Sequence, residues 1–305
     1  MKESSKKIQE LPKGDVHSHL HLGGSIATFQ KKYSSYNINF PKNYNGLGGM
    51  IDFIYNDLNR AMLTGDDVIF FMENAIESSI DDNIVYLEAS VDMNLIRFFD
   101  QSLDCLLEVV KDLKHKYHSK IDFCPDLGIN KDLDLDQVYR DGSKCIQSGI
   151  FNGIDLYGQE LGKNLDDFVE LYQEAKLNKL TTKVHIGEFS NHDTIDYAIN
   201  ILKPNELQHG INAANSLDTI NLILENDIQL NICPQSNISL GTVKNISEHP
   251  IRKLYDHGIK VTVNTDDLIL FDATVSDQLI DLYENDIFSF EEIEVISKNA
   301  FKKII

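Results

Sequence analysis

The sequence predicts a (β/α)₈ TIM barrel, and three observations support this fold class. Eight apolar or β-branched runs of strand length recur along the chain, helical segments lie between several of them, and polar residues follow the ends of the runs. Strands that alternate with helices pair in parallel through right-handed crossovers. A number near eight favours closure into a barrel over an open sheet.

The expected elements alternate along the chain. Strands are predicted at residues 14–20, 84–91, 120–129, 152–157, 181–186, 206–209, 227–233 and 258–264. Helical periodicity is clearest at residues 103–117, 165–180, 216–225 and 246–257. Ser216 and Asp218 are suitable residues for the start of the third of these helices.

A longer segment separates the first two strands. Residues 40–50 contain a proline, repeated asparagines and several glycines, which predicts a flexible loop, and residues 51–80 read as helical. We therefore expect a short helical insertion at about residues 26–83, placed at the C-terminal mouth of the barrel, where it could act as a lid. The whole chain, residues 1–305, is expected to form a single barrel domain.

The composition limits the partners that the protein can have. The 305 residues are 42% hydrophobic and 25% charged, as expected of one large enzyme core, and no apolar run reaches transmembrane length. A formal net charge of −20 disfavours nucleic acid and anionic membranes, which select clustered Lys and Arg. We expect a soluble, cytoplasmic protein that binds a small molecule, with no nucleic acid, membrane or protein partner implied. The four cysteines form no Cys-x-x-Cys pair and are expected to be buried thiols.

Two histidines, His17 and His19, stand at the end of the first predicted strand. Side chains at positions i and i+2 of a strand lie on the same face, so both rings can share one metal ion. A single histidine at a strand end is more often an ordinary polar residue that is satisfied by hydrogen bonds. Several such residues at the ends of different strands favour a functional site.

Three other strand ends carry residues of the same kind. His185 and Glu188 close the fifth strand, His209 closes the sixth, and Asp266 and Asp267 follow the eighth. Active sites of these barrels are built at the C-terminal ends of the strands, so these side chains are expected to converge. Adjacent residues of a regular strand face opposite sides, so Asp266 and Asp267 can both face the site only if the strand ends or bulges there.

This set of side chains suits hydrolysis at a metal ion. Three imidazoles and one carboxylate are good ligands for zinc, and a catalytic zinc keeps a further position for water. Binding to the metal lowers the pKa of water from near 16 to about 7. Glu188 lies just past His185, where it can reach a substrate without ligating the metal and can shuttle a proton.

Five segments together resemble the adenosine deaminases of the amidohydrolase superfamily. The resemblance runs in order from about Leu11 to the C-terminus and is carried by Pro-Lys-Gly-Asp-Val-His-Ser-His (12–19), Gly-Ile-Asp-Leu-Tyr-Gly-Gln-Glu (153–160), His-Ile-Gly-Glu (185–188), Cys-Pro-Gln-Ser-Asn (233–237) and Asn-Thr-Asp-Asp (264–267). The set is specific, although no single segment is. It implies zinc-dependent hydrolytic deamination of adenosine or a related 6-aminopurine nucleoside, which releases ammonia and a 6-oxo, inosine-type product.

The same resemblance implies the ligands of the metal. His17, His19, His185 and Asp266 would hold one zinc ion per chain. No other cofactor is implied.

Four residues take substrate or proton-transfer roles by the same resemblance. Glu188 would protonate the purine nitrogen next to the attacked carbon, and His209 would orient and help deprotonate the zinc water. Asp267 would hydrogen-bond the far ring nitrogen, and the backbone N–H of Gly158 would contact the other edge of the purine. The reaction requires a proton donor such as Glu188, because attack by water on an aromatic amidine carbon requires the ring nitrogen to gain a proton.

The sequence departs from the family at positions that affect the substrate. Relatives commonly follow the second histidine with Leu-Asp-Gly, whose aspartate contacts a ribose hydroxyl, whereas residues 20–25 read Leu-His-Leu-Gly-Gly-Ser. His21 is expected to bind substrate, with a solvated loop histidine as the alternative. Ala89 and Ser90 stand where an arginine often lies, and Leu268 stands where proline is usual. These departures put recognition of the ribose in doubt and leave the catalytic set intact.

Two other functions remain open at this stage. One is a different amidohydrolase that cleaves an amide or ester; such enzymes often bridge two metals with a carboxylated lysine, but Lys183 lies two residues before His185. The other is a pseudoenzyme that binds nucleosides or a protein. The remaining histidines without partner spacing are expected on the surface, namely His115, His118, His192, His249 and His257.

Overall fold

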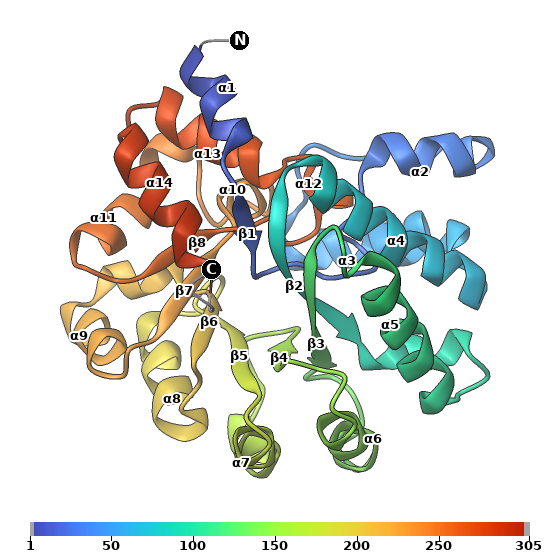
Figure 1. Cartoon of the computed structure of the whole chain (residues 1–305). Helices are drawn as coiled ribbons and strands as arrows, with labels where there is room; N and C mark the ends of the chain where they lie inside the picture. The colour runs from blue at the N-terminus through green and yellow to red at the C-terminus, as the bar shows by residue number, and fades with distance from the viewer. Residues whose placement is uncertain (1–2, 302–305) are drawn as a thin grey trace.

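A computed structural model describes residues 3–301 and contains the predicted barrel (Figure 1). Eight parallel strands follow one another around a single sheet in the order of the sequence. All eight predicted strands are found, with ends that differ by a few residues. They are β1 (Lys13–Asp15), β2 (Ile84–Asp92), β3 (Asp122–Asn130), β4 (Gly153–Tyr157), β5 (Thr181–Ile186), β6 (Glu206–His209), β7 (Gln229–Ile232) and β8 (Val261–Val263).

The sheet is nearly closed by backbone contacts just beyond β8 and β1. Strand β1 ends at Asp15 rather than at residue 20, but the chain stays extended and Ser18 forms an isolated parallel bridge with Asp266. The N–H of His19 donates to the carbonyl of Asp266 at 3.0 Å, and the N–H of Asp266 donates to the carbonyl of His17 at 2.8 Å. These bonds bring the first and last strand ends together.

Helices form an outer ring around the strands, as Figure 1 shows. The predicted start at Ser216 is confirmed, since its side chain accepts a hydrogen bond from the N–H of Thr219. The predicted helix at residues 246–257 is split, because Pro250 separates a 3₁₀ turn from the α-helix that follows. The helices of the ring are α5 (Leu103–Tyr117), α6 (Leu135–Gln147), α7 (Val169–Leu177), α8 (His192–Leu202), α9 (Leu217–Glu225), α11 (Ile251–Asp256), α13 (Val275–Glu284) and α14 (Phe290–Asn299).

Short helical turns connect several of these elements. The predicted helix at residues 165–180 begins as a 3₁₀ turn and becomes α-helical only at Val169. The 3₁₀ segments of the ring are η3 (Met93–Phe98), η4 (Leu165–Phe168), η5 (Ile211–Asn215) and η6 (Ile246–Glu248).

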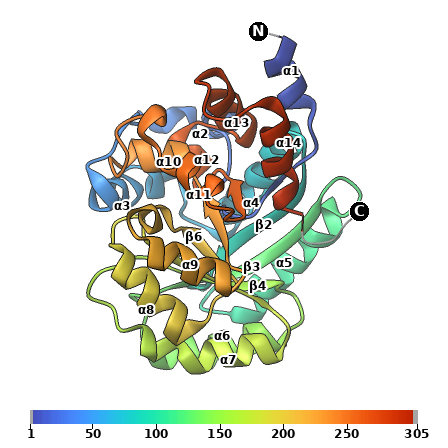
Figure 2. The same ribbon diagram turned by 90° about the vertical axis from the view of Figure 1, so that its left-hand side faces the viewer.

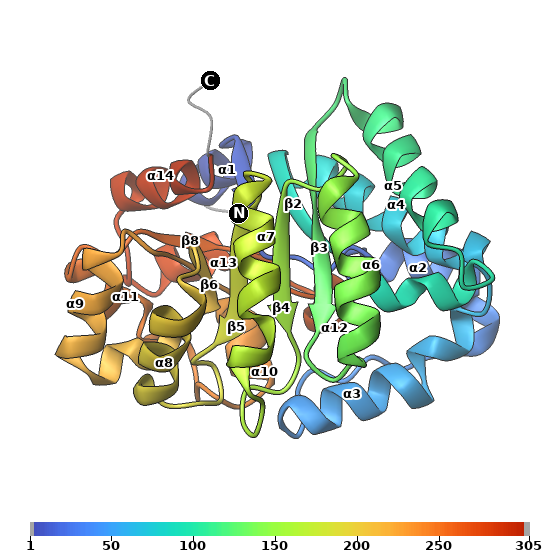
Figure 3. The ribbon, with the colours of Figure 1, turned by 90° about the horizontal axis from the view of Figure 1, so that it is seen from below.

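Three helices occupy the predicted insertion between β1 and β2: α2 (Ile26–Tyr33), α3 (Gly46–Asn56) and α4 (Gly65–Asp81), with 3₁₀ turns η1 (Ser34–Tyr36) and η2 (Leu58–Ala61). The expectation of a loop up to residue 50 is wrong, since α3 already begins at Gly46. The segment at residues 51–80 is not one helix, because the side chain of Thr64 caps a new one. Figure 3 shows α3 beyond the arrowheads of β3 and β4, at the end of the barrel opposite the chain termini. Its role as a lid stays a prediction.

The opposite end of the barrel is covered by the first and last helices. Helix α1 (Glu3–Glu10) packs beside α13 and α14 (Figure 2). Within residues 3–301, no helix has the combination of length and apolar character that crossing a membrane requires. Three of the four cysteines are buried as expected, but Cys105 is exposed on α5.

The interior of the barrel contains a buried lysine. Lys183 of β5 is fully buried, and its ammonium group lies 2.5 Å from a carboxylate oxygen of Glu88 and 2.6 Å from one of Asp126. It also donates to the carbonyl of Val16 at 2.9 Å. A buried charge is tolerated only when it is paired and hydrogen-bonded, and this lysine meets both conditions.

Candidate active site

The four predicted metal-binding side chains meet at the C-terminal end of the barrel. His17 and His19 follow β1, His185 lies on β5, and Asp266 follows β8. The ring centre of His17 lies 6.2 Å from that of His19 and 4.7 Å from that of His185. Asp266 Oδ1 lies 3.5 Å from Nε2 of both His17 and His19. All four side chains are buried.

The backbone after β8 explains how two adjacent aspartates face one site. Strand β8 ends at Val263, and Asp266 adopts a left-handed conformation with φ of 60°. This turn breaks the strand alternation, so Asp266 and Asp267 both line the same cavity. Asp267 then precedes the short helix α12 (Leu268–Phe271). The expectation that the strand ends before these residues is confirmed.

The surroundings of His17 suit a metal ligand. Its Nδ1 lies 2.9 Å from the carbonyl of Asn231, so the neutral ring donates from Nδ1 and leaves the lone pair of Nε2 available. Nε2 is buried without a hydrogen-bond partner. The carboxylate of Asp266 that faces it is oriented in turn, because Ser236 Oγ donates to Oδ2 at 2.6 Å. A buried acceptor without a donor, next to an oriented carboxylate, fits a cation.

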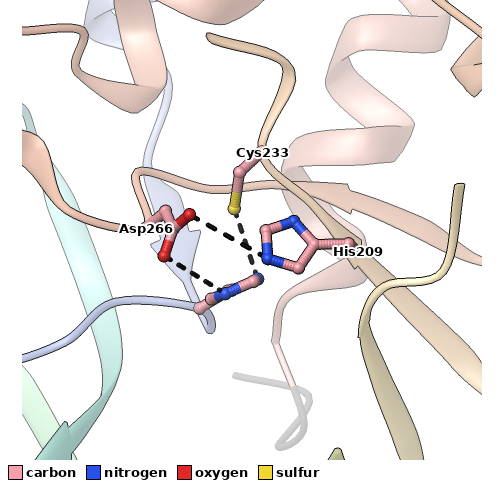
Figure 4. Close-up of side chains that lie close together, drawn as sticks. His209, Cys233 and Asp266 are labelled. Atoms are coloured by element: carbon pink, nitrogen blue, oxygen red, sulfur yellow. Dashed lines mark hydrogen bonds and ion pairs between the residues drawn. The ribbon is translucent and has the colours of Figure 1, made fainter. Parts of the chain in front are cut away.

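A different grouping of donors lies close by. Figure 4 shows His209, Cys233 and Asp266 close together. One possible ligand atom of each lies within 4.8 Å of the others and of one on His17. The sulfur of Cys233 lies 3.2 Å from Nδ1 of His17, the nitrogen that already bonds the carbonyl of Asn231. Burial and the nearby carboxylates of the site raise the pKa of the Cys233 thiol well above its ordinary value. Cys233 faces the nitrogen of His17 that is already hydrogen-bonded, whereas His19 and Asp266 lie on the side of its free Nε2, so the three histidines with Asp266 fit a metal better.

Asp155 also belongs to the site, and sequence reasoning assigned it no role. Its Oδ2 lies 3.1 Å from Nε2 of His185, and it accepts a hydrogen bond from the hydroxyl of Ser90. Its Oδ1 is buried without a hydrogen-bond partner. Although burial raises the pKa of this carboxyl, the neighbouring His185 outweighs that effect and holds it well below the usual range. The signal in the sequence was an acid within a strand, inside the Gly-Ile-Asp-Leu segment.

Glu188 lies at the turn that follows β5. Its Oε2 is 3.5 Å from Nε2 of His209, and its Oε1 accepts a hydrogen bond of 2.6 Å from the amide of Asn237. Burial, followed by the charges of Asp266 and Glu160, raises the pKa of Glu188 well above its ordinary value. This shift favours the protonated form of Glu188, which can serve as an acid.

The conformation of this turn depends on Glu160. One carboxylate oxygen accepts from the N–H groups of Gly187 and Ser190 at 2.7 and 3.0 Å. The other accepts from the N–H groups of Glu188 and Phe189 at 3.0 and 3.2 Å. A single buried carboxylate thus holds four consecutive backbone donors.

A cavity of about 420 Å³ opens above the four metal-binding candidates. Glu188, Asp267 and Gly158 line it, and so do five residues of α3: Leu47, Met50, Ile51, Ile54 and Tyr55. Gly158 has φ of +100°, and a Cβ at this position would lie 2.7 Å from Oδ1 of Asn130. A side chain there would be strained and would clash.

His21 also lines the cavity, and its Nδ1 is buried without a hydrogen-bond partner. Burial, the main cause, lowers the pKa of His21 to about 4. The ring is therefore neutral and partly buried at the wall of the cavity, unlike a solvated loop histidine.

One of the histidines expected on the surface lies in the interior. His249 is 5% exposed and its Nε2 lies 3.1 Å from Oδ1 of Asn237. His115, His118 and His257 are exposed and His192 is partly exposed. The prediction for His249 is wrong because the residue follows η6 and is folded inward by tertiary contacts that its local sequence does not reveal.

Comparison with known proteins identifies the family. Residues 12–304 match the family model described as adenosine deaminase. The chain belongs to the adenosine deaminase family. A putative adenosine/adenine deaminase of Treponema pallidum is 35% identical over 92% of this chain and 94% of its own. Members of this family are metal-dependent hydrolases, and this adenosine deaminase family protein removes an amino group from a purine.

Two solved structures share the fold. The adenine deaminase from Arthrobacter aurescens has a TM-score of 0.83 and 21% identity, with 95% of this chain and 92% of that one covered. An amidohydrolase from Burkholderia ambifaria with bound Zn has a TM-score of 0.79 and 17% identity, with coverages of 98% and 87%. These likenesses support the barrel architecture of this family member.

Proposed function

We propose that the protein deaminates adenosine or a closely related 6-aminopurine nucleoside by hydrolysis, with one Zn²⁺ per chain. The observation that carries this proposal is the position of Glu188. A carboxyl group whose pKa is raised by burial lines the same cavity as His19, His185 and Asp266. This combines a proton donor with a set of metal ligands in one pocket of a size suited to a small ligand.

The proposed ligands of the zinc ion are His17, His19, His185 and Asp266. Zinc–ligand bonds of about 2.0–2.2 Å require the ligand atoms of one ion to lie within about 4.4 Å of one another. The 3.5 Å separations between Asp266 Oδ1 and the two histidine nitrogens are consistent with this spacing. The Burkholderia ambifaria structure, which contains Zn, supports the choice of metal. When bound, zinc would act as a Lewis acid that makes water a stronger acid and nucleophile at neutral pH.

Glu188 is proposed to donate a proton to the purine, and His209 is proposed to orient the attacking water. The protonated Glu188 delivers its proton to the purine nitrogen beside the amino-bearing carbon, and this makes that carbon electrophilic. His209 Nε2 lies 3.5 Å from Glu188 and 3.9 Å from Asp266 Oδ2. A ring placed between the two carboxyl groups can orient the attacking water.

Asp267 and Gly158 are proposed to position the purine. Burial, followed by the charges of Asp266 and Glu188, raises the pKa of Asp267 well above its ordinary value. A protonated Asp267 can donate a hydrogen bond to the far ring nitrogen of the purine. The N–H of Gly158 lies on the cavity wall, where the missing side chain lets the ring approach the backbone.

The charges around the cavity favour a nucleoside over a nucleotide. Among the described residues of its wall, one side chain, Arg97, is permanently positive. The wall also carries six carboxyl groups, those of Asp92, Asp132, Glu160, Glu188, Asp266 and Asp267. Glu188 and Asp267 are proposed to be protonated and Asp266 to bind the metal, so the acidic residues that oppose a phosphate dianion are Asp92, Asp132 and Glu160. They outnumber Arg97, and a neutral nucleoside does not meet this repulsion. The neutral His21 is proposed to hydrogen-bond the sugar.

A two-metal amidohydrolase that cleaves amides or esters fits the site less well. Lys183 would be the candidate for the carboxylated bridging lysine. Although its burial opposes charge, the nearby Asp126 and Glu88 outweigh this and raise the pKa of Lys183 well above the ordinary value. An ammonium group held between two carboxylates has no free lone pair to react with carbon dioxide, and this supports a site with one metal.

Ultraviolet absorbance and ammonia release test the proposal. The metal-loaded protein is incubated separately with adenosine, 2′-deoxyadenosine, adenine and AMP. We expect a spectral shift and equal ammonia release with the nucleosides and much slower turnover of AMP. Faster turnover of AMP than of adenosine would contradict the nucleoside assignment. No ammonia from any of the four would contradict the proposed reaction.

A further inference from the structure

We propose that His249 is a positioning residue, which fixes the side-chain amide of Asn237 so that its nitrogen faces Glu188 and His209. His249 touches neither the cavity nor the predicted metal ligands, and it acts through Asn237. The inference rests on the proposed roles of Glu188 and His209 and adds a residue that supports both.

The hydrogen bonds of His249 define which nitrogen carries the proton. The N–H of Ile251 donates to Nδ1 of His249 at 3.1 Å, so Nδ1 must be an acceptor. Burial lowers the pKa of His249 to about 3, so the ring is neutral. The proton therefore lies on Nε2, which is 3.1 Å from Oδ1 of Asn237 and donates to it.

This donor selects one orientation of the Asn237 amide. In the observed orientation, Nδ2 donates to Oε1 of Glu188 at 2.6 Å and lies 3.3 Å from Nδ1 of His209. If the amide rotated by 180°, Nδ2 would face the N–H of His249, and Oδ1 would face Glu188. Two donors would then oppose each other, and Glu188 and His209 would lose the N–H group that faces them both. The two orientations of the amide have nearly the same shape, and the N–H of His249 favours the observed one.

The backbone of Asn237 is held independently of His249. Its N–H donates to the carbonyl of Cys233 at 3.0 Å, within the segment that forms helix α10 (Pro234–Ser239). Its carbonyl accepts from the N–H groups of Thr242 and Val243 at 3.0 and 3.1 Å. Loss of the His249 donor is therefore expected to release the amide and not the loop.

Three variants test the inference in the metal-loaded protein with adenosine. His249→Phe keeps an aromatic ring but has no donor, His249→Gln provides an amide donor, and His257→Phe is a matched control at an exposed histidine just after α11. We expect His249→Phe to lower kcat by about 10- to 100-fold, part of the effect of a positioned general acid, with KM and bound zinc unchanged. We expect His249→Gln to recover much of this loss and His257→Phe to match the wild type.

A fall in kcat with unchanged KM and bound zinc distinguishes the loss of a positioning contact from a general disturbance of the site. A kcat of His249→Phe within about twofold of the wild type would overturn the proposal, and so would a loss of zinc that parallels the loss of kcat. Failure of the wild type itself to turn over adenosine would instead contradict the proposed function.

A spectroscopic measurement on the wild type decides the question if His249→Phe does not fold. Long-range ¹H–¹⁵N correlation of ¹⁵N-histidine-labelled protein reports the tautomer of each ring. We expect His249 to be neutral at pH 7 with the proton on Nε2. A proton on Nδ1, or a doubly protonated ring, would overturn the proposal because neither is compatible with the hydrogen-bond chain.

Discussion

Replacement of Glu160 by glutamine tests whether one carboxylate holds the turn that carries the proposed proton donor. Each of its two oxygens accepts from two backbone N–H groups of residues 187–190, at 2.7–3.2 Å. Glutamine keeps one of these oxygens and presents an NH₂ group in place of the other. If the NH₂ group replaces Oε1, the N–H groups of Glu188 and Phe189 lose their acceptor. If it replaces Oε2, the N–H of Ser190 loses its acceptor, whereas the N–H of Gly187 keeps Ser190 Oγ at 3.1 Å.

The expected destabilisation follows from the one or two donors that lose their acceptor. A buried donor without an acceptor costs about 1–3 kcal/mol, so the free energy of unfolding should fall by about 1–6 kcal/mol. This is a large share of the total stability of about 5–15 kcal/mol that is typical of folded proteins.

The pH dependence of activity should change as well. Burial, then Asp266, then Glu160 raise the pKa of Glu188, so removal of the charge at position 160 should lower that pKa. Glu188 is proposed to act in its protonated form, and activity is then lost as the pH rises through its pKa. The variant should therefore lose activity at a lower pH than the wild type.

Urea unfolding and the pH profile of kcat check both effects in the metal-loaded protein. Glu170→Gln, on the exposed face of α7, is a matched control and should behave as the wild type. A change in the free energy of unfolding below about 0.5 kcal/mol, as for an ordinary surface substitution, would refute the reasoning.

Three further predictions concern the site itself. Glu188→Gln should lower kcat by about 10²–10⁴-fold with zinc content unchanged by elemental analysis, and full turnover by this variant would exclude Glu188 as the proton donor. Gly158→Ala should raise KM, because the residue has φ of +100° and the new methyl group would lie 2.7 Å from Asn130 Oδ1; unchanged steady-state kinetics would contradict a close approach of substrate to this backbone. Chelation of the metal should abolish turnover and lower the melting temperature, and added zinc should restore both, whereas turnover by a protein shown to be metal-free would contradict the proposed centre.

The strands and their order can be predicted from the sequence because buried parallel strands are continuous apolar runs. Their ends are less certain, as the first strand shows: it ends at Asp15, although the chain remains extended to His19. The ends of the helices are equally difficult to predict. Gly46 was expected in a loop but begins α3, with a φ of 66° that glycine adopts readily.

The predicted metal ligands could be found because each stands at the end of a strand, and the barrel brings strand ends together. Asp155 was assigned no role, although it lies on β4 in a segment that the family resemblance includes. Its contact with His185 joins residues 30 positions apart. Such a pairing depends on the register of β4 and β5, which the sequence of either strand does not specify.

By itself, the sequence determined the barrel, the family and the set of metal-binding candidates, because strand periodicity and short motifs are local properties of the chain. Only the tertiary structure decided that His249 is buried, that Asn237 links it to Glu188, and that Glu160 holds the turn after β5. The physical reason is that these groups are defined by their hydrogen-bond partners on other segments. A polar residue is buried where such partners exist, and folding alone brings them within reach.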